Sequence, residues 1–582
     1  MKLPNWNLNS LFKNDAEALN FLTLAGVKVA SFETDFKDKI IRLKPTEILT
    51  AIKQYEAISD DLGKAGSYAY LRYAINMNDE KVLILYQSIS EKISEIAAKL
   101  AFFTIELNSL PESILNEEVL VFFKPFLKQN RIFKPYELSK ELEEMLIRKS
   151  ITSTDAWVRF YDETLANLKF NLDGKKVNIS IILDKLSSKK SEERKLAAKE
   201  LGKILGENIK TFTFAINTII KDKQIEDDYR GFEKPIDSRN LSNFVETEVV
   251  ESLIQSVKDS YPALSHKYYS LKAKIFKSES LKYWDRNAPL PFDNDKAFSF
   301  EEAKKITLES YKEFSPKMSE IAELFFKNNW IDAEVKEGKD SGAFSHSTVP
   351  SANPFVMLNF LGKTRDVATM AHELGHGVHQ FLAKKQGALM AGTPLTLAET
   401  ASVFGEMLVF QNLLKLAQTK EEKLAILGGK IEDMLNTVVR QIAFCDFETK
   451  LHNLRKEEEL TADVISKAWL EVQGESLGNA IVFEDEYKNF WGYISHFFHA
   501  PFYVYAYAFG DCLVNSLYAI YKEGKVANFE EKYLEMLSFG GSLHHSELLK
   551  PFGINLQDKQ FWNGGLNILK SYINEFEKLL VS

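Results

Sequence analysis

Two histidines four residues apart, with a glutamate directly after the first, have the spacing that most clearly predicts chemistry. They lie in Ala371-His-Glu-Leu-Gly-His-Gly-Val-His379, where His372, Glu373 and His376 form an HExxH pattern. In a helix, residues four apart share one face, about one turn apart, so both imidazoles can bind a single Zn²⁺. Glu373 can then reach a metal-bound water without being a ligand itself. The pattern predicts a metal-dependent hydrolytic site.

A catalytic zinc ion needs a third protein ligand, and Glu399 is the main candidate. It stands in Thr396-Leu-Ala-Glu-Thr-Ala-Ser-Val-Phe-Gly-Glu406, a run of small and apolar residues where a carboxylate is costly unless paired or metal-bound. A second helix that crosses the first would deliver it. Glu406, two helical turns further on, would hold the free N–H of a ligand histidine; the alternative is an ordinary surface or helix-pair carboxylate. His379 would need the helix to bend before it could bind the metal, so we expect a packing or substrate-side role for it.

A stretch rich in histidine and tyrosine could stabilise an oxyanion. It runs His496-Phe-Phe-His-Ala-Pro-Phe-Tyr-Val-Tyr-Ala-Tyr507. Tyrosine hydroxyl and imidazole groups can donate to the oxyanion that forms when a peptide carbonyl is attacked. A tyrosine-rich stripe alone is more often core, so this interpretation depends on the HExxH motif. The histidines support it, because only His266 lies before residue 340 and the other nine lie after it.

Together these motifs resemble peptidase family M3, a family of zinc metallopeptidases, and within it the oligoendopeptidase F branch. The resemblance is carried by residues 371–379, 397–406 and 502–507 and by Lys339-Asp-Ser-Gly-Ala-Phe-Ser345. It extends upstream to Ala156-Trp-Val-Arg-Phe160 and to Ile179-Ser-Ile-Ile-Leu183, so it covers the chain from about residue 150 to the end. Only a general helical similarity precedes it.

The resemblance implies a mainly α fold: a multi-helical, two-lobed, zincin-type metallopeptidase with a deep central channel and a small β-sheet next to the HExxH helix. It implies one Zn²⁺ per chain at the bottom of the channel, and cleavage of short peptides rather than folded proteins. His372, His376 and Glu399 match the family's zinc ligands, and Glu373 matches its catalytic base.

The resemblance also implies which residues meet the substrate. A segment similar to the family's peptide-facing edge strand would pair with the substrate backbone, through Gly342, Ala343 and Phe344. His496 and Tyr505 fit the spacing of the family's oxyanion donors best. Tyr503 and Tyr507 are near alternatives, and Tyr507 is also a candidate to bind substrate.

The elements that must position these residues are mostly helices. Apolar residues recur at three- and four-residue spacing over 48–62, 82–108, 135–149, 191–219, 300–314, 421–456 and 529–539. The HExxH helix is expected to start at Thr364 to Asp366.

Strand signals are few. Asp173-Gly174 between two alternating runs predicts a hairpin near 168–180, and β-branched and aromatic residues predict a second sheet over 330–360. Polar residues 187–191 mark a soft boundary. We expect a helical, oligoendopeptidase-F-like region over 1–187 and a catalytic M3-type domain over 188–582.

Composition narrows the class of protein. The 582 residues include 42 Phe, 22 Tyr and 7 Trp, enough to bury a large core, which excludes a mainly disordered chain. The net charge of −9 disfavours nucleic-acid partners. There is no signal-peptide pattern and no apolar run near the ~20 residues of a membrane span, and the two cysteines fit free thiols in a reducing compartment. We therefore expect a cytoplasmic protein without a membrane or nucleic-acid partner, of undefined oligomeric state.

The function predicted from the sequence is a zinc-dependent endopeptidase that hydrolyses short oligopeptides in the cytoplasm, with Glu373 activating a zinc-bound water. Two alternatives stay open: a zinc carboxypeptidase on a related helical fold, and a catalytically silent helical peptide-binding protein. The sequence does not specify the side chains preferred at the cut site, and Mn²⁺ or Co²⁺ could replace zinc.

Overall fold

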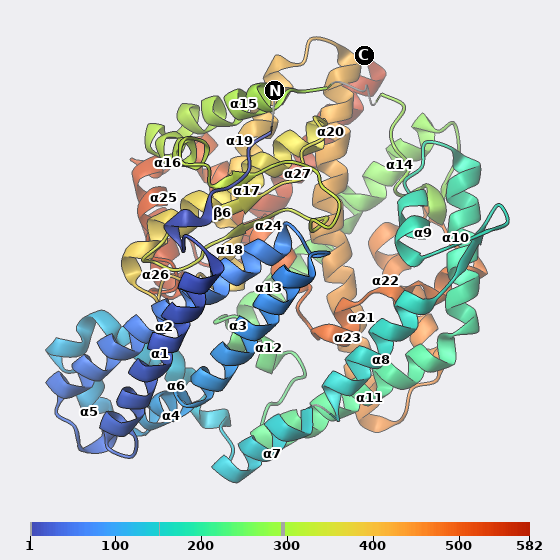
Figure 1. Ribbon diagram of the computed structural model, residues 1–582. Coiled ribbons are helices and arrows are strands. Elements are labelled where there is room, and N and C mark those ends of the chain that lie inside the picture. The colour runs from blue at the N-terminus through green and yellow to red at the C-terminus, as the bar shows by residue number, and fades with distance from the viewer. Residues whose placement is uncertain (1–2, 151, 293–296) are drawn as a thin grey trace. The chain divides into compact units, whose positions relative to one another are not determined.

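The protein consists mostly of helices (Figure 1). Its computed structural model describes residues 3–150, 152–292 and 297–582. The mainly α class expected from the sequence is confirmed. Internal contacts divide the chain into two units. Unit 1 comprises Met1–Pro135, Asp295–Leu416 and Glu523–Ile554; unit 2 comprises Tyr136–Asn294, Ala417–Lys522 and Asn555–Ser582. The predicted boundary at residue 187 stays a prediction.

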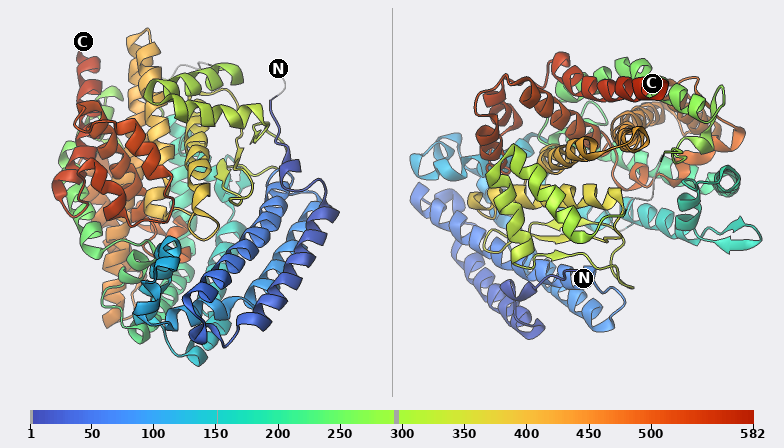
Figure 2. Two further views of the ribbon diagram at one scale, coloured as in Figure 1. Left: turned by 90° about the vertical axis from the view of Figure 1, so that its left-hand side faces the viewer. Right: turned by 90° about the horizontal axis from the view of Figure 1, so that it is seen from above.

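Unit 1 contains a group of N-terminal helices and a group around the HExxH segment. The first group is α1 (Asp15–Phe36), α2 (Pro45–Ala74), α3 (Glu80–Ala98), α4 (Ala101–Ser109), α5 (Glu112–Leu115) and α6 (Lys124–Ile132). The second is α15 (Phe300–Phe314), α16 (Pro316–Lys327), α17 (Thr364–Ala383), α18 (Leu395–Ala398), α19 (Thr400–Leu416), α25 (Phe529–Leu537) and α26 (His545–Leu549). Helices α1, α2 and α3 pack side by side (Figure 2).

A three-stranded sheet accompanies the HExxH helix in unit 1. Its strands are β4 (Ile331–Asp332), β5 (Phe344–His346) and β6 (Phe355–Met357), in the order β4-β6-β5. β4 pairs parallel with β6, and β5 pairs antiparallel with it, with Ser345 opposite Val356. β6 is completely buried, and both β5 and β6 contact α17. The predicted sheet next to the HExxH helix is therefore present, with β5 at one edge.

Unit 2 consists of helices and two short strand pairs. The helices are α7 (Lys140–Ser150), α8 (Thr154–Asn167), α9 (Ile179–Lys185), α10 (Ser191–Glu207), α11 (Ile209–Arg230), α12 (Asp237–Ser242), α13 (Thr247–Ser260), α14 (Ser265–Ile275), α20 (Lys420–Met434), α21 (Arg440–Glu457), α22 (Ala462–Leu477), α23 (His496–His499), α24 (Tyr505–Glu523) and α27 (Lys559–Val581). The strands are β1 (Phe170–Leu172), β2 (Lys175–Val177), β3 (Leu281–Lys282) and β7 (Ile481–Val482).

The predicted hairpin is confirmed, with a shorter second strand than the sequence suggested. β1 and β2 pair antiparallel, and Asp173 and Gly174 between them both have positive φ, as a two-residue hairpin turn requires. The pairing stops at Val177, because the side chain of Asn178 accepts the N–H of Ile181 and starts α9 instead.

Two long helical patterns are each divided into two helices. The pattern over 191–219 predicts one stretch, but α10 ends at Glu207. The side chain of the next residue, Asn208, donates to the carbonyl of Ile204. Asparagine competes in this way with helix propagation. The 82–108 pattern is likewise divided between α3 and α4, at Lys99 and Leu100. Apolar periodicity continues across both breaks, so it does not reveal them.

Both cysteines are buried and unpaired. Cys445 and Cys512 are at most 1% exposed, and burial raises the pKa of each thiol. Among the helices of the described ranges, none combines the length and the apolar character needed to cross a membrane.

Candidate active site

Helix α17 presents His372 and His376 on the face opposite its buried apolar stripe. It starts at Thr364, because the carboxylate of Asp366 accepts the N–H groups of Leu361 (2.8 Å) and Lys363 (3.0 Å). Three apolar side chains are fully buried and fix the rotation of the helix: Val367, Met370 and Leu374. His372 and His376 are only part-buried, so their imidazoles can meet a ligand.

A glycine lets a second segment approach this helix closely. A Cβ on Gly375 would lie 2.4 Å from the carbonyl oxygen of Ala401 and 2.7 Å from the Cα of Ser402. Both atoms belong to α19, so the α19 backbone rests directly on α17. Glu399 lies between α18 and α19, and this contact brings its carboxylate to the two histidines.

Gly375→Ala is expected to destabilise the protein, since the new Cβ meets rigid backbone atoms and α19 must move away. Overpacking of this kind costs about 1–3 kcal/mol. Denaturant unfolding would measure the change in the free energy of unfolding. Gly429→Ala is the matched control: its Cβ would have no neighbour within 4 Å, and alanine favours a helix, so stability should stay or rise slightly. Equal effects of the two substitutions would contradict the close approach.

The donor atoms of His372, His376 and Glu399 are arranged as a metal site requires. These atoms lie within 4.8 Å of one another. The Nε2 atoms of His372 and His376 are each 3.4 Å from Oε2 of Glu399. Ligands bound at about 2.0–2.1 Å in a tetrahedral site are roughly 3.3 Å apart. Two imidazoles and one carboxylate therefore fit a zinc ion in both chemistry and spacing.

The protonation of these groups follows from their mutual charge. Burial alone would lower the pKa of His372, but the carboxylates of Glu406, Glu399 and Glu373 outweigh it and raise that pKa to about 9. Burial alone would raise the pKa of Glu399, but hydrogen bonding and charge from the histidines lower it to about 2. The hydroxyl of Ser402 also donates to Oε2 of Glu399, at 2.6 Å. The negative charge of these carboxylates therefore favours a bound cation at the site, which can be either a proton or a metal ion.

Glu406 lies against the other nitrogen of His372. Its Oε2 is 3.4 Å from His372 Nδ1, while Nε2 of the same ring points to Glu399. A carboxylate in this position fixes the tautomer and the ring orientation of a ligand histidine. The geometry agrees with the arrangement expected for Glu406, whose role stays a proposal.

Glu373 is joined to the edge strand of the sheet. Glu373 is 7% exposed. Its carboxylate accepts the backbone N–H of Ser345 in β5, and burial raises its pKa. Two turns along α17, Gln380 donates to the carbonyl of Ser345 (3.1 Å) and accepts from its hydroxyl (2.8 Å). The backbone of Ser345 therefore faces α17 rather than β6, and α17 and β5 are tied together beside the metal ligands.

Gly342, Ala343 and Phe344 are expected to bind the substrate backbone, and they differ in the contacts that they already make within the protein. The N–H of Gly342 donates to Asp340 and its carbonyl accepts from Asn359, both at 2.8 Å, so its backbone is already used. The ring of Phe344 contacts Trp6 and Tyr70. Alternation along a strand turns the backbone of Ala343 to the same side as that of Ser345. The backbone of Ala343 is thus placed on the side away from β6.

His379 does not join the metal ligands. Its Nε2 is 3.2 Å from the hydroxyl of Thr393, its ring also bonds the backbone of Ala398, and burial lowers its pKa to about 4. It lines a cavity of about 470 Å³ that includes His376 and Lys384. The cavity therefore adjoins one of the three candidate metal ligands, His376.

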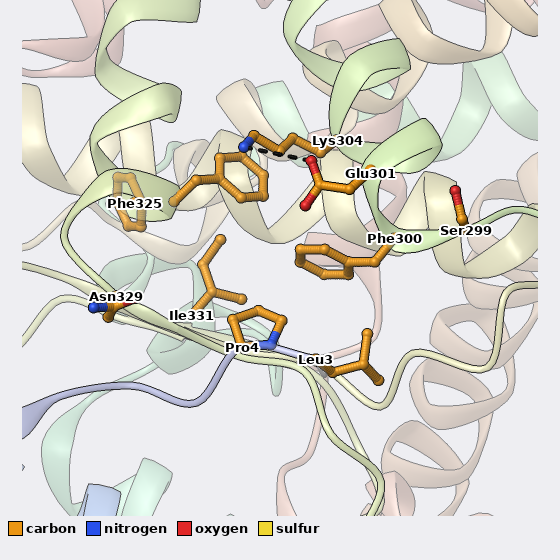
Figure 3. A pocket seen from close by; sticks show the side chains of 10 residues that line it. Leu3, Pro4, Ser299, Phe300, Glu301, Lys304, Phe325, Asn329 and Ile331 are labelled. Carbon is orange, nitrogen blue, oxygen red and sulfur yellow. Dashed lines mark ion pairs between the residues drawn. The ribbon is translucent and has the colours of Figure 1, made fainter. Parts of the chain in front are cut away.

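A second cavity in unit 1 contains none of the predicted site residues. It measures about 400 Å³ and lies at the start of α15, with Phe300, Phe325 and Ile331 around it and Leu3 and Pro4 along one side (Figure 3). An ion pair between Glu301 and Lys304 borders it. We assign it no role in the chemistry.

In unit 2, three of the predicted oxyanion donors lie together. His496 Nε2 is 3.4 Å from the hydroxyl of Tyr507, and the ring of Tyr503 lies 6.1 Å from His496 and 5.2 Å from Tyr507. Burial lowers the pKa of His496, which favours the neutral imidazole. Tyr505 is fully buried, and its hydroxyl accepts from Asn243 at 2.8 Å. The structure therefore groups Tyr503 and Tyr507 with His496, and turns Tyr505 into the core.

A strained turn holds this cluster in place. Phe502 has φ +60°, an unusual conformation for a bulky residue, and its N–H donates to the buried carboxylate of Glu448 at 2.8 Å. The carbonyl of Pro501 accepts from Arg239. The other oxygen of Glu448 has no hydrogen-bond partner within the described ranges. Burial raises the pKa of Glu448 to about 8.

Glu448→Gln is expected to flatten the pH dependence of stability. The folded state holds the Glu448 proton up to about pH 8, whereas the unfolded chain releases it near the ordinary pKa of 4.5. The stability that the Glu448 carboxyl group contributes to the wild type is therefore lost as the pH rises from about 4.5 to about 8. The loss is at most about 1.4 kcal/mol for each pH unit. Urea unfolding at pH 5, 7 and 9 should show the free energy of unfolding of Glu448→Gln increasing, relative to that of wild type, as the pH rises. Glu457→Gln, at an exposed position of α21, is the control; parallel profiles for wild type and Glu448→Gln would refute the idea.

Several supporting residues were not foreseen from the sequence. They are Ser345, Gln380, Ser402 and Glu448. Ser402 had a recognisable signal, a hydroxyl three residues after a carboxylate at a helix start. The others act across contacts between segments distant in sequence, which a single sequence does not display.

Comparisons with known proteins agree with these features. Residues 185–568 match the family described as Peptidase family M3, and residues 106–170 match the family described as Oligopeptidase F. The chain is 25% identical to Oligopeptidase PepF of Bacillus subtilis, over 99% of the chain and 87% of that protein. It is 28% identical to the chromosomal oligoendopeptidase F of Lactococcus lactis subsp. cremoris, over 68% of the chain and 65% of that protein.

Solved structures share the fold. A protein from Chlamydophila abortus superposes with a TM-score of 0.88 at 23% identity, over 99% of this chain and 98% of the other. Oligoendopeptidase-F from Enterococcus faecium gives a TM-score of 0.71 at 20% identity, over 97% and 98%.

Proposed function

The chain belongs to peptidase family M3, and from that membership we propose that it is a zinc-dependent endopeptidase that hydrolyses short oligopeptides. The observation that carries the proposal is the convergence of His372, His376 and Glu399 within 4.8 Å, with Glu373 on the same helix as the histidines. The relatives named oligopeptidase and oligoendopeptidase support a short peptide as the substrate. We retain the cytoplasm as the predicted location.

One zinc ion per chain would be held by His372, His376 and Glu399. Such an ion supplies Lewis acidity and lowers the pKa of water toward about 7. Two further side chains hold these ligands in position: Glu406 orients the ring of His372, and Ser402 orients the carboxylate of Glu399.

Glu373 is the proposed general base and acid. Its carboxylate takes a proton from the attacking water and returns it to the leaving amine as the peptide bond breaks. Burial raises the pKa of Glu373, which helps its carboxylate to hold the proton between these two steps. The N–H of Ser345 keeps the carboxylate from turning away.

The developing oxyanion would receive hydrogen bonds from His496, Tyr503 or Tyr507. We assign the donor role to these three rather than to Tyr505, because the Tyr505 hydroxyl is buried and bonded to Asn243. The substrate backbone would pair with the β5 edge at Ala343, by strand addition.

A peptide ladder of increasing length, digested with and without a chelator, tests the proposal. We expect chelator-sensitive cleavage at internal bonds, and cleavage that persists when both peptide ends are blocked. Release of single residues from free C-termini alone would favour a carboxypeptidase. Binding without cleavage, and without zinc in the gently purified protein, would favour a silent peptide-binding protein.

A further inference from the structure

The cavity beside His376 has a lysine in its wall. Four side chains along α17 and its C-terminal end line this cavity of about 470 Å³: His376, His379, Gln380 and Lys384. Their spacing of three, four and eight residues from His376 places them on one face of the helix. At 1.5 Å per residue, Lys384 follows His376 by about 12 Å along the helix axis. The cavity therefore extends from a candidate metal ligand to a basic group.

No acidic side chain balances the charge of Lys384. Its ammonium group donates to the carbonyl of Ala352 (3.0 Å) and to the side-chain oxygen of Asn353 (3.3 Å), and it lies 5.4 Å from the ring centroid of Phe381. All three groups are neutral. Within the described ranges, no carboxylate forms an ion pair with Lys384, and none lines the cavity. Burial lowers the pKa of Lys384, and no nearby acid opposes that shift.

The bonds of Lys384 hold the ammonium in place and leave it able to bind a further group. An ammonium has three N–H donors, so one remains after the bonds to Ala352 and Asn353. The side chain is part-buried, which reduces the screening of its charge by water. A part-buried cation without a counter-charge favours an anion beside it.

Two carboxylates of α2 hold the loops that line the cavity but do not line it themselves. The carboxylate of Glu56 accepts backbone N–H groups from the loop over 388–393. Asp60 accepts the N–H of Ser351 (3.2 Å) and its hydroxyl, in the loop over 347–354. Each carboxylate is therefore engaged by the loop that it holds. The remaining lining is neutral and includes small residues such as Gly63 and Ala398, which leave room for a side chain.

We propose that this cavity binds an acidic side chain of the peptide substrate, and that Lys384 recognises its carboxylate. A carboxylate here gains a charge-assisted hydrogen bond from the ammonium. This inference rests on the proposed peptidase function and gives it a substrate class, peptides with Asp or Glu near the scissile bond. An extended peptide advances about 3.3 Å per residue, so the distance of about 12 Å between His376 and Lys384 places the acidic residue within about three positions of that bond.

The test compares peptides that differ by one charge. A quenched fluorescent peptide with both ends blocked receives Glu, or Gln as its neutral match, at each of three positions on either side of the cut. With zinc-loaded, full-length wild type, we expect the kcat/KM of the Glu peptide to exceed that of the Gln peptide by about 10- to 100-fold at one position, mainly through KM. Equal values for Glu and Gln at every position would overturn the proposal.

Substitutions of Lys384 separate recognition of the substrate from support of the neighbouring loop. Lys384→Gln should reduce the ratio of Glu to Gln cleavage to near one, whereas Lys384→Arg, which keeps the charge, should retain most of it. Lys384→Glu should reverse the preference, in favour of a peptide with Lys at that position. Lys384→Gln protein that cleaves both peptides more slowly at an unchanged ratio would overturn the proposal, since that pattern indicates a structural role.

Lys385→Gln is the matched control. This lysine is the next residue along the chain, but it is exposed and does not line the cavity. Its substitution removes the same charge from the same end of α17, so the ratio of Glu to Gln cleavage should stay at the wild-type value. An equal loss of the ratio in Lys385→Gln and Lys384→Gln would overturn the proposal, because it would indicate a general effect of net charge.

Binding measurements separate this proposal from the proposed function. Fluorescence anisotropy of labelled Glu and Gln peptides on Glu373→Gln protein needs no turnover. Tighter binding of the Glu peptide, by about 10- to 100-fold and lost when Lys384→Gln is added, would support the cavity site even if no peptide were cleaved. Equal binding of the two peptides would count against the cavity site even if cleavage were confirmed.

Discussion

Glu373→Gln is expected to lower kcat by about 10²- to 10⁴-fold, the usual contribution of a positioned acid–base group. Glutamine keeps an oxygen that can accept the N–H of Ser345, so the side chain should stay in place, but it cannot take a proton from water. The zinc ligands are untouched, and zinc content should therefore remain near one per chain. Steady-state kinetics on a quenched peptide, together with metal analysis of the same preparation, checks both halves of the expectation.

Glu313→Gln provides the matched control for this experiment. Its side chain is 64% exposed at the end of α15, so both turnover and zinc content should equal those of wild type. Wild-type turnover in the Glu373→Gln protein would remove Glu373 from the mechanism. Loss of zinc along with turnover would mean that this carboxylate holds the metal instead.

Glu399→Ala is expected to abolish both zinc binding and hydrolysis. The substitution leaves only His372 and His376, too few ligands to hold zinc against a chelator. The loss in zinc affinity should exceed the 10- to 100-fold that removal of an outer carboxylate costs. Glu406→Gln, which alters only the partner of His372 Nδ1, should fall within that smaller range.

Competition with a chelator gives the zinc affinity of each variant, and thermal unfolding gives an independent reading. A ligand that binds only the folded state stabilises it, so a chelator should lower the Tm of wild type and leave that of Glu399→Ala unchanged. If Glu399→Ala bound zinc as tightly as wild type, the third ligand would have to be sought elsewhere.

The sequence predicted the metal group well because the information is local. His372, Glu373 and His376 lie within one helical turn, and the polar–apolar pattern around them specifies that turn. Glu399 was identified because a carboxylate among small apolar residues needs a partner. Its approach to α17 depends on Gly375, whose importance appears only when the α19 backbone is seen against it.

The tyrosines were harder to distinguish. Tyr503, Tyr505 and Tyr507 alternate with small and apolar residues, and the spacing from His496 alone favoured Tyr505. Residues four apart share a helix face, whereas one two residues away points to the other side, and α24 starts at Tyr505. The strained turn at Phe502, which sets the direction of the chain here, has no signature in a single sequence.

The bonds between Ser345 and α17 also bear on the solubility of the protein. An uncovered strand at the edge of a sheet is a template on which copies of a protein aggregate, because its N–H and C=O groups pair with any other strand. In β5 the outward pair at Ser345 is already occupied by Glu373 and Gln380. The strand has only three residues, so the edge that is left is too short for two copies to pair along it. A Gln380→Ala protein, with that carbonyl released, should precipitate more readily at high concentration.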